Sequence, residues 1–181
     1  MRFKNKKVCV IGLGYVGLPL AVAFAERSKV IGFDIDELRV SELNEGFDAT
    51  GEISNSQLLT VCNNLFFTNH KNNISDCNIY IVTVPTPIDD SNKPDLSALV
   101  NASSIVGSVL NKDDIVIFES TVYPGVTEDI CVPVLENASG LNFNNDFYCG
   151  YSPERINPGD KERTLKKIKK VISGSTPEAS N

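Results

Sequence analysis

Gly12-Leu13-Gly14-Tyr15-Val16-Gly17 is the stretch that decides the fold of this chain. An apolar run, 8–11, precedes it, and a helix-like run, 18–25, follows it. A G-x-G-x-x-G pattern between a strand and a helix is typical of a turn that binds a dinucleotide. The first glycine permits the tight turn, the second lets a pyrophosphate approach the backbone, and the third lets the helix pack closely on the strand. The helix N-terminus then offers unpaired N–H groups to the phosphates. The alternative is a glycine-rich turn that binds nothing.

A carboxylate stands at the expected distance beyond this turn. Val30-Ile31-Gly32-Phe33-Asp34 reads as the next strand, and an acidic residue about 20 residues past the glycines accepts hydrogen bonds from the ribose of the dinucleotide. We expect Asp34 to make this contact, with Asp36 as a competitor farther from the strand end. Because a carboxylate repels a 2′-phosphate, NAD is favoured over NADP. Two roles stay open for Arg39 on the next helix: contact with the adenine or ribose, or a solvated helix position.

Composition indicates one ordinary globular domain. Of the 181 residues, 41% are hydrophobic and 22% are charged, and the net charge of −6 argues against a nucleic-acid surface. No apolar stretch reaches transmembrane length, and the N-terminus lacks a signal-peptide core, so we expect no membrane partner. The five cysteines form no C-x-x-C pair and no metal-ligand cluster is visible. Reduced thiols and no bound metal, in the cytoplasm, are the simplest account.

Apolar runs alternate with helix-like segments along the whole chain. We expect strands at 7–11, 29–33, 65–68, 78–84, 114–118, 147–150 and 170–173, and helices at 18–27, 36–44, 58–63, 95–110 and 127–136, the last disturbed by Pro133. This order predicts an α/β, Rossmann-like, doubly wound and mainly parallel sheet with helices on both faces. We expect an NAD-binding domain over residues 1–175. Residues 176–181 begin a connecting helix that the chain truncates, because Thr176, Pro177 and Glu178 suit a helix start.

The ends of the later strands carry polar groups between stiff residues. In such sheets ligands bind outside the carboxyl ends of the strands. Thr86 lies between two prolines after the fourth strand, and Thr121 follows the fifth. After the sixth strand, Glu154 is a candidate general acid or base, and Arg155 and Asn157 are donors toward an anionic substrate. The alternative is a set of rigid surface loops with a local ion pair.

Four segments in this order resemble the UDP-glucose/GDP-mannose dehydrogenase family: Gly-Leu-Gly-Tyr-Val-Gly-Leu-Pro, Val-Pro-Thr-Pro, Glu-Ser-Thr-Val-Tyr-Pro-Gly and Ser-Pro-Glu-Arg-Ile-Asn-Pro-Gly-Asp. The resemblance covers essentially the whole chain. The last segment looks most like the branch that oxidises UDP-N-acetylhexosamines, because UDP-glucose dehydrogenases typically carry Phe-Leu after that glutamate. The resemblance therefore implies the N-terminal NAD-binding domain of a nucleotide-sugar 6-dehydrogenase.

That family oxidises the sugar C6 alcohol of a UDP-sugar, here UDP-N-acetylhexosamine or UDP-glucose, to a uronic acid with two NAD. The resemblance implies polysaccharide biosynthesis, a cytoplasmic enzyme and a homodimer of the full-length protein. It implies Glu154 and Thr121 as catalytic residues, the first positioning or activating water. It implies a substrate site at Arg155, Ile156 and Asn157. Matching the family's motifs and the glycine turn gives this set of NAD contacts: Gly12, Gly14, Tyr15, Val16, Gly17, Asp34, Arg39, Thr86 and Thr121.

One departure limits the expected activity. The family's nucleophilic cysteine, with its partner lysine and asparagine, belongs to a region beyond residue 181. None of the five cysteines here has that context; Cys149, which is nearest to Glu154, falls inside an expected strand. We therefore expect this chain to bind NAD but not to turn over alone, its missing C-terminal domains being a partner. The alternatives are a stand-alone NAD-binding or regulatory module and, less favoured, a short hydroxyacid dehydrogenase.

Overall fold

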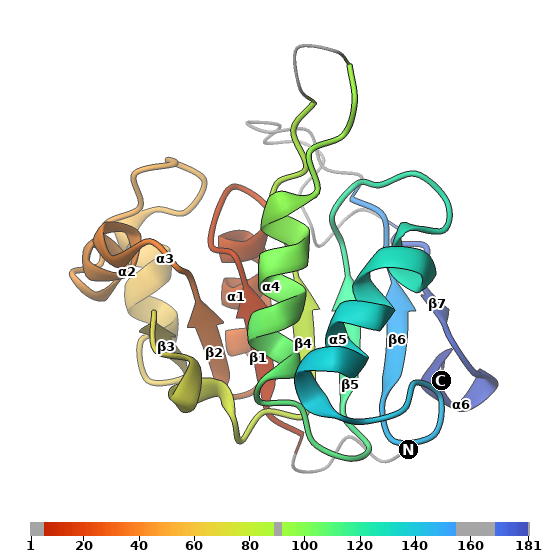
Figure 1. Ribbon diagram of the computed structural model, residues 1–181. Helices are drawn as coiled ribbons and strands as arrows, with labels where there is room; N and C mark the ends of the chain where they lie inside the picture. The colour runs from red at the N-terminus through yellow and green to blue at the C-terminus, as the bar shows by residue number, and fades with distance from the viewer. Residues whose placement is uncertain (1–5, 89–91, 155–168, 181) are drawn as a thin grey trace.

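A single sheet with helices on both faces makes up the molecule (Figure 1). The computed structural model describes residues 6–88, 92–154 and 169–180. Within these residues the sheet has seven strands in the order β3-β2-β1-β4-β5-β6-β7. The chain runs outward from β1 in one direction and then returns to build the other half. This is the predicted doubly wound, Rossmann-like topology, and it is confirmed.

The first six strands are parallel, and each is four residues long. Val8 on β1 lies opposite Val30 on β2 and Ile79 on β4, so the strand ends stand level at the edge of the sheet. The strands are β1 (Val8–Ile11), β2 (Val30–Phe33), β3 (Leu65–Thr68), β4 (Ile79–Val82), β5 (Ile115–Phe118), β6 (Tyr148–Tyr151) and β7 (Ser173–Gly174). Because parallel strands of equal length end together, the loops after β1, β2, β4, β5 and β6 meet on one side.

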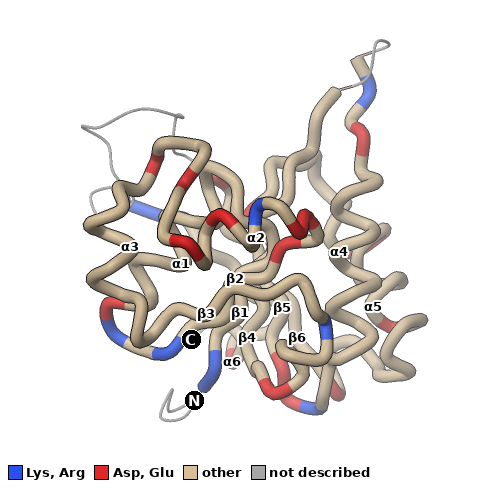
Figure 2. Tube along the Cα trace, turned by 90° about the vertical axis from the view of Figure 1, so that its left-hand side faces the viewer, with Lys and Arg blue, Asp and Glu red and all other residues tan. Residues whose placement is uncertain are grey.

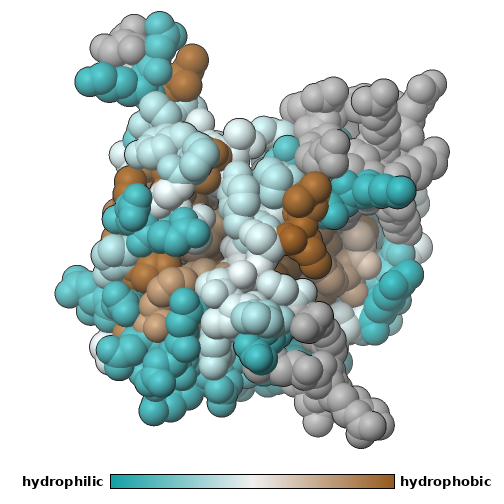
Figure 3. Space-filling view, turned by 90° about the vertical axis from the view of Figure 1, so that its right-hand side faces the viewer, coloured by the Kyte–Doolittle hydropathy of each residue, from teal (hydrophilic) through white to brown (hydrophobic). Residues whose placement is uncertain are grey.

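Only the last strand departs from the parallel pattern. β7 pairs antiparallel with β6 through two residues, Ser173 and Gly174. The predicted strand at 170–173 was therefore placed too early. Val171 and Ile172, which suggested it, are 58% and 68% exposed. Figure 3 shows the side of the molecule on which β7 lies, where some apolar side chains reach the surface. An apolar pair reads as strand in sequence even when it makes no sheet contact.

Two separate cores lie on the two faces of the sheet. Successive residues of a strand point to opposite faces, so Cys9 and Ile11 belong to one core and Val8 and Val10 to the other. The first core packs under α4 (Ser97–Gly107) and α5 (Val132–Ser139). The second packs under α1 (Gly17–Ala25), α2 (Glu37–Asn44) and α3 (Asn55–Val61). Strands covered on both faces explain the nearly unbroken apolar runs in the sequence.

Local capping sets where two of the helices begin. Asp36 is the N-cap of α2, and its carboxylate accepts hydrogen bonds from the N–H groups of Leu38 and Arg39. Ser54 and Gln57 form a reciprocal capping box that starts α3 at Asn55. The expected helix at 58–63 therefore began three residues late. The Ser-x-x-Gln signal for the earlier start was present in the sequence.

Pro133 shapes the chain as expected, but the helix continues beyond it. A π-helical turn, η2 (Thr127–Cys131), leads into α5, and Pro133 occupies the first turn of α5, where it needs no hydrogen-bonding N–H. The helix ends at Ser139, three residues after the predicted limit, and is capped by Gly140 in the left-handed conformation with φ of 71°. A short 3-10 helix, η1 (Lys71–Ile74), precedes β4, and α6 (Pro177–Ser180) begins with the Thr176 hydroxyl accepting from Ala179.

Candidate cofactor-binding site

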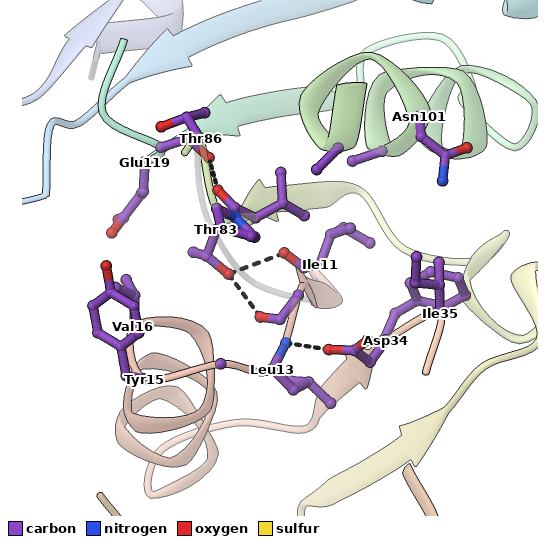
Figure 4. A pocket seen from close by; sticks show the side chains of 18 of the residues that line it. Ile11, Leu13, Tyr15, Val16, Asp34, Ile35, Thr83, Thr86, Asn101 and Glu119 are labelled. Carbon is purple, nitrogen blue, oxygen red and sulfur yellow. Dashed lines mark hydrogen bonds between the residues drawn. The ribbon is translucent and has the colours of Figure 1, made fainter. Parts of the chain in front are cut away.

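A cavity of about 730 Å³ opens at the carboxyl ends of the central strands (Figure 4). Its lining brings together the glycine turn, the end of β2, the loops after β4 and β5, and one side of α4. The lining side chains and backbone that bear on function come from Gly12, Gly14, Tyr15, Val16, Asp34, Thr83, Thr86, Asn101, Glu119, Thr121 and Glu154. A large cavity with mostly apolar walls and a few converging polar groups is typical of a small-molecule site. Its place at the reversal of strand order is where doubly wound sheets bind ligands.

The three glycines of the turn differ in backbone conformation and in the space around them. Gly12 has φ of 90°, a backbone conformation that disfavours side chains, and its N–H donates to Phe33 O at 2.8 Å. A Cβ on Gly17 would lie 1.8 Å from Gly12 O and 2.4 Å from the Thr83 hydroxyl. A Cβ on Gly14 would meet nothing within 4 Å. No neighbour among the described residues therefore requires a glycine at position 14, and Gly14 lines the cavity.

Asp34 reaches the cavity and also ties the turn to β2. One carboxylate oxygen accepts from Leu13 N–H at 2.7 Å, and the other accepts from Asp36 N–H at 3.0 Å. A carboxylate offers about four acceptor sites, so capacity remains for a ligand hydroxyl. Asp36, its competitor in the sequence, caps α2 and does not line the cavity.

Arg39 lies behind the glycine turn. Its Nε and Nη2 atoms donate to Leu13 O at 3.0 and 2.8 Å, and Nη2 also pairs with Asp48 at 2.7 Å. The side chain is 10% exposed, so the solvated alternative is wrong. Arg39 is absent from the described lining of the cavity. Its predicted contact with the cofactor remains a prediction.

Sequence reasoning missed Thr83, which fastens the turn from the other side. The Thr83 hydroxyl lies 2.9 Å from Ile11 O and 2.8 Å from Gly12 O and shares its proton between them (Figure 4). The residue is buried at the end of β4. A hydroxyl residue closing an otherwise apolar strand was the available signal. Only the pairing of β4 with β1 brings it to the turn.

The loops after β4 and β5 are joined at the cavity. Thr86 donates its hydroxyl proton to Thr121 O at 2.6 Å. The prolines on either side of Thr86 restrict the backbone of this segment, and Thr121 also lines the cavity. The two threonines predicted from separate motifs therefore lie together at one wall.

A buried carboxylate that was not predicted as a site residue stands beside them. Glu119, at the end of β5, is 5% exposed, points toward the cavity, and forms an ion pair with Lys170 Nζ (Figure 4). Burial raises the pKa of Glu119, the Lys170 ammonium opposes this, and the nearby Glu154 carboxylate adds to the rise. Glu154 lines the same cavity. Glu119 and Glu154 thus place two carboxyl groups at the end opposite Asp34.

Arg155, Ile156 and Asn157 lie outside the described residues. Cys149 is buried in β6, its thiol pKa is raised by burial, and it does not line the cavity. No group of three or more metal-ligating His, Cys, Asp or Glu side chains is found within residues 6–88, 92–154 and 169–180.

Charges are dispersed over the described part of the chain. Within residues 6–88, 92–154 and 169–180, Lys and Arg stand among more numerous Asp and Glu, without a long basic run (Figure 2). No helix among the described residues has the length and apolar character needed to cross a bilayer.

Residues 6–181 match the model of the UDP-glucose/GDP-mannose dehydrogenase family, NAD binding domain. This chain belongs to that family. The match confirms the predicted family and, with it, NAD as the cofactor of this domain. It agrees with the glycine turn and Asp34 that the fold places at the cavity.

Several proteins similar to this chain are named as dehydrogenases of N-acetylated UDP-sugars. A UDP-N-acetyl-D-glucosamine 6-dehydrogenase of Pseudomonas aeruginosa is 59% identical over 97% of this chain and 41% of its own length. Protein CapL of Staphylococcus aureus is 52% identical over 96% of this chain and 41% of its own length. The solved UDP-D-ManNAc dehydrogenase of Pyrococcus horikoshii superposes with a TM-score of 0.86 at 35% identity, covering 96% of this chain and 42% of that one. The chain thus spans about two fifths of these relatives.

Proposed function

We propose that this chain is the NAD-binding part of a UDP-N-acetylhexosamine 6-dehydrogenase, which oxidises the C6 alcohol of a UDP-sugar to a uronic acid with two NAD. The 59% identity to a UDP-N-acetyl-D-glucosamine 6-dehydrogenase supports this sugar, with UDP-glucose as the alternative. The observation that carries the proposal is the single cavity in which the glycine turn and Asp34 lie at one end and Thr121, Glu119 and Glu154 at the other.

The residues at the cavity fit an NAD molecule. The turn with Gly12, Gly14, Tyr15, Val16 and Gly17 would hold the pyrophosphate, because Gly14 leaves space for it and α1 begins there. Asp34 would accept from the adenosine ribose, Arg39 would support that end, and Thr86 and Thr121 would line the nicotinamide half. When bound, NAD supplies the hydride acceptor.

The opposite end of the cavity would serve the chemistry. We assign Glu154, assisted by Thr121, to position and activate a water molecule. We assign Arg155, Ile156 and Asn157 to the sugar-nucleotide site, on the strength of their motif. The family's nucleophilic cysteine would come from a further part of the polypeptide, so this chain alone is expected to bind cofactor without turnover.

The wider setting is proposed on the same grounds. We place the full-length protein in the cytoplasm, because the five cysteines make no disulfide in the described chain. The relative named CapL supports a role in surface-polysaccharide biosynthesis. The homodimer rests on the family resemblance. The connecting helix proposed from residue 176 fits the start of α6.

Calorimetric titration of the 181-residue chain with NAD tests the cofactor assignment. Asp34→Ala is expected to weaken binding roughly 10- to 100-fold, the loss expected for hydrogen bonds to a charged group. Asp36→Ala is the matched control, since it removes a neighbouring carboxylate that caps α2 outside the cavity. Unchanged affinity in Asp34→Ala, or a loss confined to Asp36→Ala, would show that the ribose assignment is wrong.

A panel of UDP- and GDP-sugars, assayed with the product of the complete reading frame, tests the substrate. We expect two NADH per sugar oxidised, with UDP-N-acetylglucosamine among the best substrates. NAD reduction with small 2- or 3-hydroxy acids would favour the hydroxyacid dehydrogenase instead. A stop codon directly after Asn181 would favour the stand-alone module, whereas a downstream glycine-rich segment with a cysteine supports the dehydrogenase.

A further inference from the structure

Two peptide groups follow Gly12: the one between Gly12 and Leu13 and the one between Leu13 and Gly14. Side chains from outside the glycine turn form hydrogen bonds with both. In the first peptide group, Gly12 O accepts from the Thr83 hydroxyl at 2.8 Å and Leu13 N–H donates to Asp34 at 2.7 Å. In the second, Leu13 O accepts from two nitrogens of Arg39, at 3.0 and 2.8 Å. The orientation of each peptide plane is therefore set by partners from β2, β4 and α2.

The contact of Arg39 with Leu13 O also sets the direction of Gly14 N–H, which belongs to the same peptide group. No peptide bond among the described residues is cis, and in a planar trans peptide the C=O and N–H groups point in opposite directions. A guanidinium that holds Leu13 O thus turns Gly14 N–H away from Arg39. Gly14 borders the cavity and Arg39 does not, and Gly14 N–H has no hydrogen-bond partner within the described residues. The second glycine is also where a pyrophosphate approaches the backbone.

Arg39 is itself held by a buried carboxylate. The Asp48 side chain is fully buried and accepts from Arg39 at 2.7 Å, from Thr50 N–H at 3.0 Å and from Ile53 N–H at 2.9 Å. Burial alone would raise the pKa of Asp48, but these hydrogen bonds together keep it below its usual range, so the carboxylate stays charged. Within the described residues Arg39 Nη1 is buried without a partner. Leu13 O and Asp48 therefore orient the guanidinium, and this orientation leaves its Nη1 donor without a hydrogen bond among the described residues.

We propose that Asp48 is a positioning residue for the cofactor pyrophosphate: it fixes Arg39 so that the guanidinium clamps Leu13 O and presents Gly14 N–H to the ligand. The inference rests on the proposed NAD-binding function. Asp48 does not line the cavity and acts only through Arg39 and the turn. It lies between α2 and α3, in a segment that no dinucleotide motif includes.

Calorimetry on the 181-residue chain tests whether Asp48 acts through Arg39, by means of a double-mutant cycle. Asp48→Asn and Arg39→Met are each expected to weaken NAD binding about tenfold, and the double variant no more than Arg39→Met alone. Adenosine, which lacks the pyrophosphate, is expected to bind Asp48→Asn as tightly as it binds the unchanged chain. If the losses of NAD affinity in the two single variants add up in the double variant, Asp48 does not act through Arg39. If Asp48→Asn weakens adenosine as much as NAD, it does not act on the pyrophosphate. Either result would overturn the proposal.

Asp114→Asn is the matched control, because Asp114 is another buried carboxylate, placed before β5 at the opposite end of the strands. It should lower thermal stability while leaving NAD affinity within about twofold, since it touches no part of the site. A comparable loss of NAD affinity in Asp114→Asn would show that the effect of Asp48 is general destabilisation. Arg39→Lys, which keeps the charge but not the two-nitrogen grip, replaces Asp48→Asn should the latter not fold, and unchanged NAD affinity there overturns the clamp.

The amide resonance of Gly14 reports the orientation without any ligand. We expect its ¹⁵N–¹H shift to move in Asp48→Asn and in Arg39→Lys and to stay in place in Asp114→Asn. An unmoved Gly14 resonance would refute the role of Asp48. Failure of the unchanged chain to bind NAD would refute the proposed function instead, and the amide shift would still decide whether Asp48 orients the turn.

Discussion

Gly17→Ala should lower the stability of this protein, whereas Gly14→Ala should leave its stability intact and weaken NAD binding. A Cβ on Gly17 would lie 1.8 Å from Gly12 O, although real contacts of this kind essentially never fall below 3.0 Å. The nearby atoms are backbone and the Thr83 hydroxyl, which is itself bonded to Ile11 O and Gly12 O. The start of α1 must therefore move away from the turn by roughly 1 Å or more, against close-packed neighbours.

The magnitude follows from what this movement disrupts. Overpacking typically costs about 1–3 kcal/mol, and here loss of the Thr83 hydrogen bond adds about 1 kcal/mol. We expect Gly17→Ala to lose about 2–4 kcal/mol, a large part of the usual 5–15 kcal/mol of stability. Gly14→Ala meets no atom within 4 Å and Gly14 has no positive φ, so its stability should be unchanged or slightly higher. Its methyl group occupies pyrophosphate space, so NAD affinity should fall more than about tenfold.

Urea denaturation and NAD titration of the two variants separate the effects. The expected result is a lowered midpoint for Gly17→Ala, and a normal midpoint with weak NAD binding for Gly14→Ala. Normal NAD affinity in Gly14→Ala would refute the placement of the pyrophosphate. A fully stable Gly17→Ala would refute the close packing of α1 on the turn.

Three further outcomes follow from the described contacts. Ser54→Ala removes the capping box of α3 and should cost about 1 kcal/mol in urea denaturation; no measurable change would mean that the cap is dispensable. Hydrogen bonds from Asn142 N–H and then the Lys112 ammonium lower the pKa of Asp146 to about 2, so its stabilisation is present above the unfolded-state pKa of about 3.9 and is lost as pH falls toward 2. The difference in melting temperature between wild type and Asp146→Asn should therefore shrink over that range, and a constant difference would contradict it. Lys170→Met leaves Glu119 buried without its cation and should destabilise by about 3 kcal/mol near neutral pH. The loss should shrink in acid, because burial raises the pKa of Glu119 and a protonated carboxyl needs no cation; a pH-independent loss would argue against the ion pair.

Most of the fold could be predicted because its signals are local. The run Leu65–Thr68 was predicted as a strand with the observed bounds, and the glycine turn defined both β1 and α1. Errors arose where short-range patterns competed: the capping box at Ser54 was overlooked, and the apolar pair before Ser173 was taken for a strand. Both involve short elements, in which one cap or one pairing decides the boundary.

Some residues of the candidate site could likewise be predicted from local sequence, and others could not. Asp34, Thr86 and Thr121 were found because each follows a recognisable strand, and all three line the cavity. Thr83 and Glu119 were missed, because their value lies in contacts with residues far along the chain. Thr83 meets Gly12 across 71 positions, and Glu119 meets Lys170 across 51.

By itself the sequence determined the alternating fold, the dinucleotide turn and the family, since these depend on the spacing of glycines, carboxylates and apolar runs over short distances. Only the tertiary structure decided what holds the turn in place. It showed that Arg39 holds Leu13 O, and it revealed Asp48 bound to the same guanidinium. The physical reason is that a peptide plane is oriented by whichever donors and acceptors the packed strands and helices bring to it, and that meeting is set by sheet register and helix position rather than by neighbours in the chain.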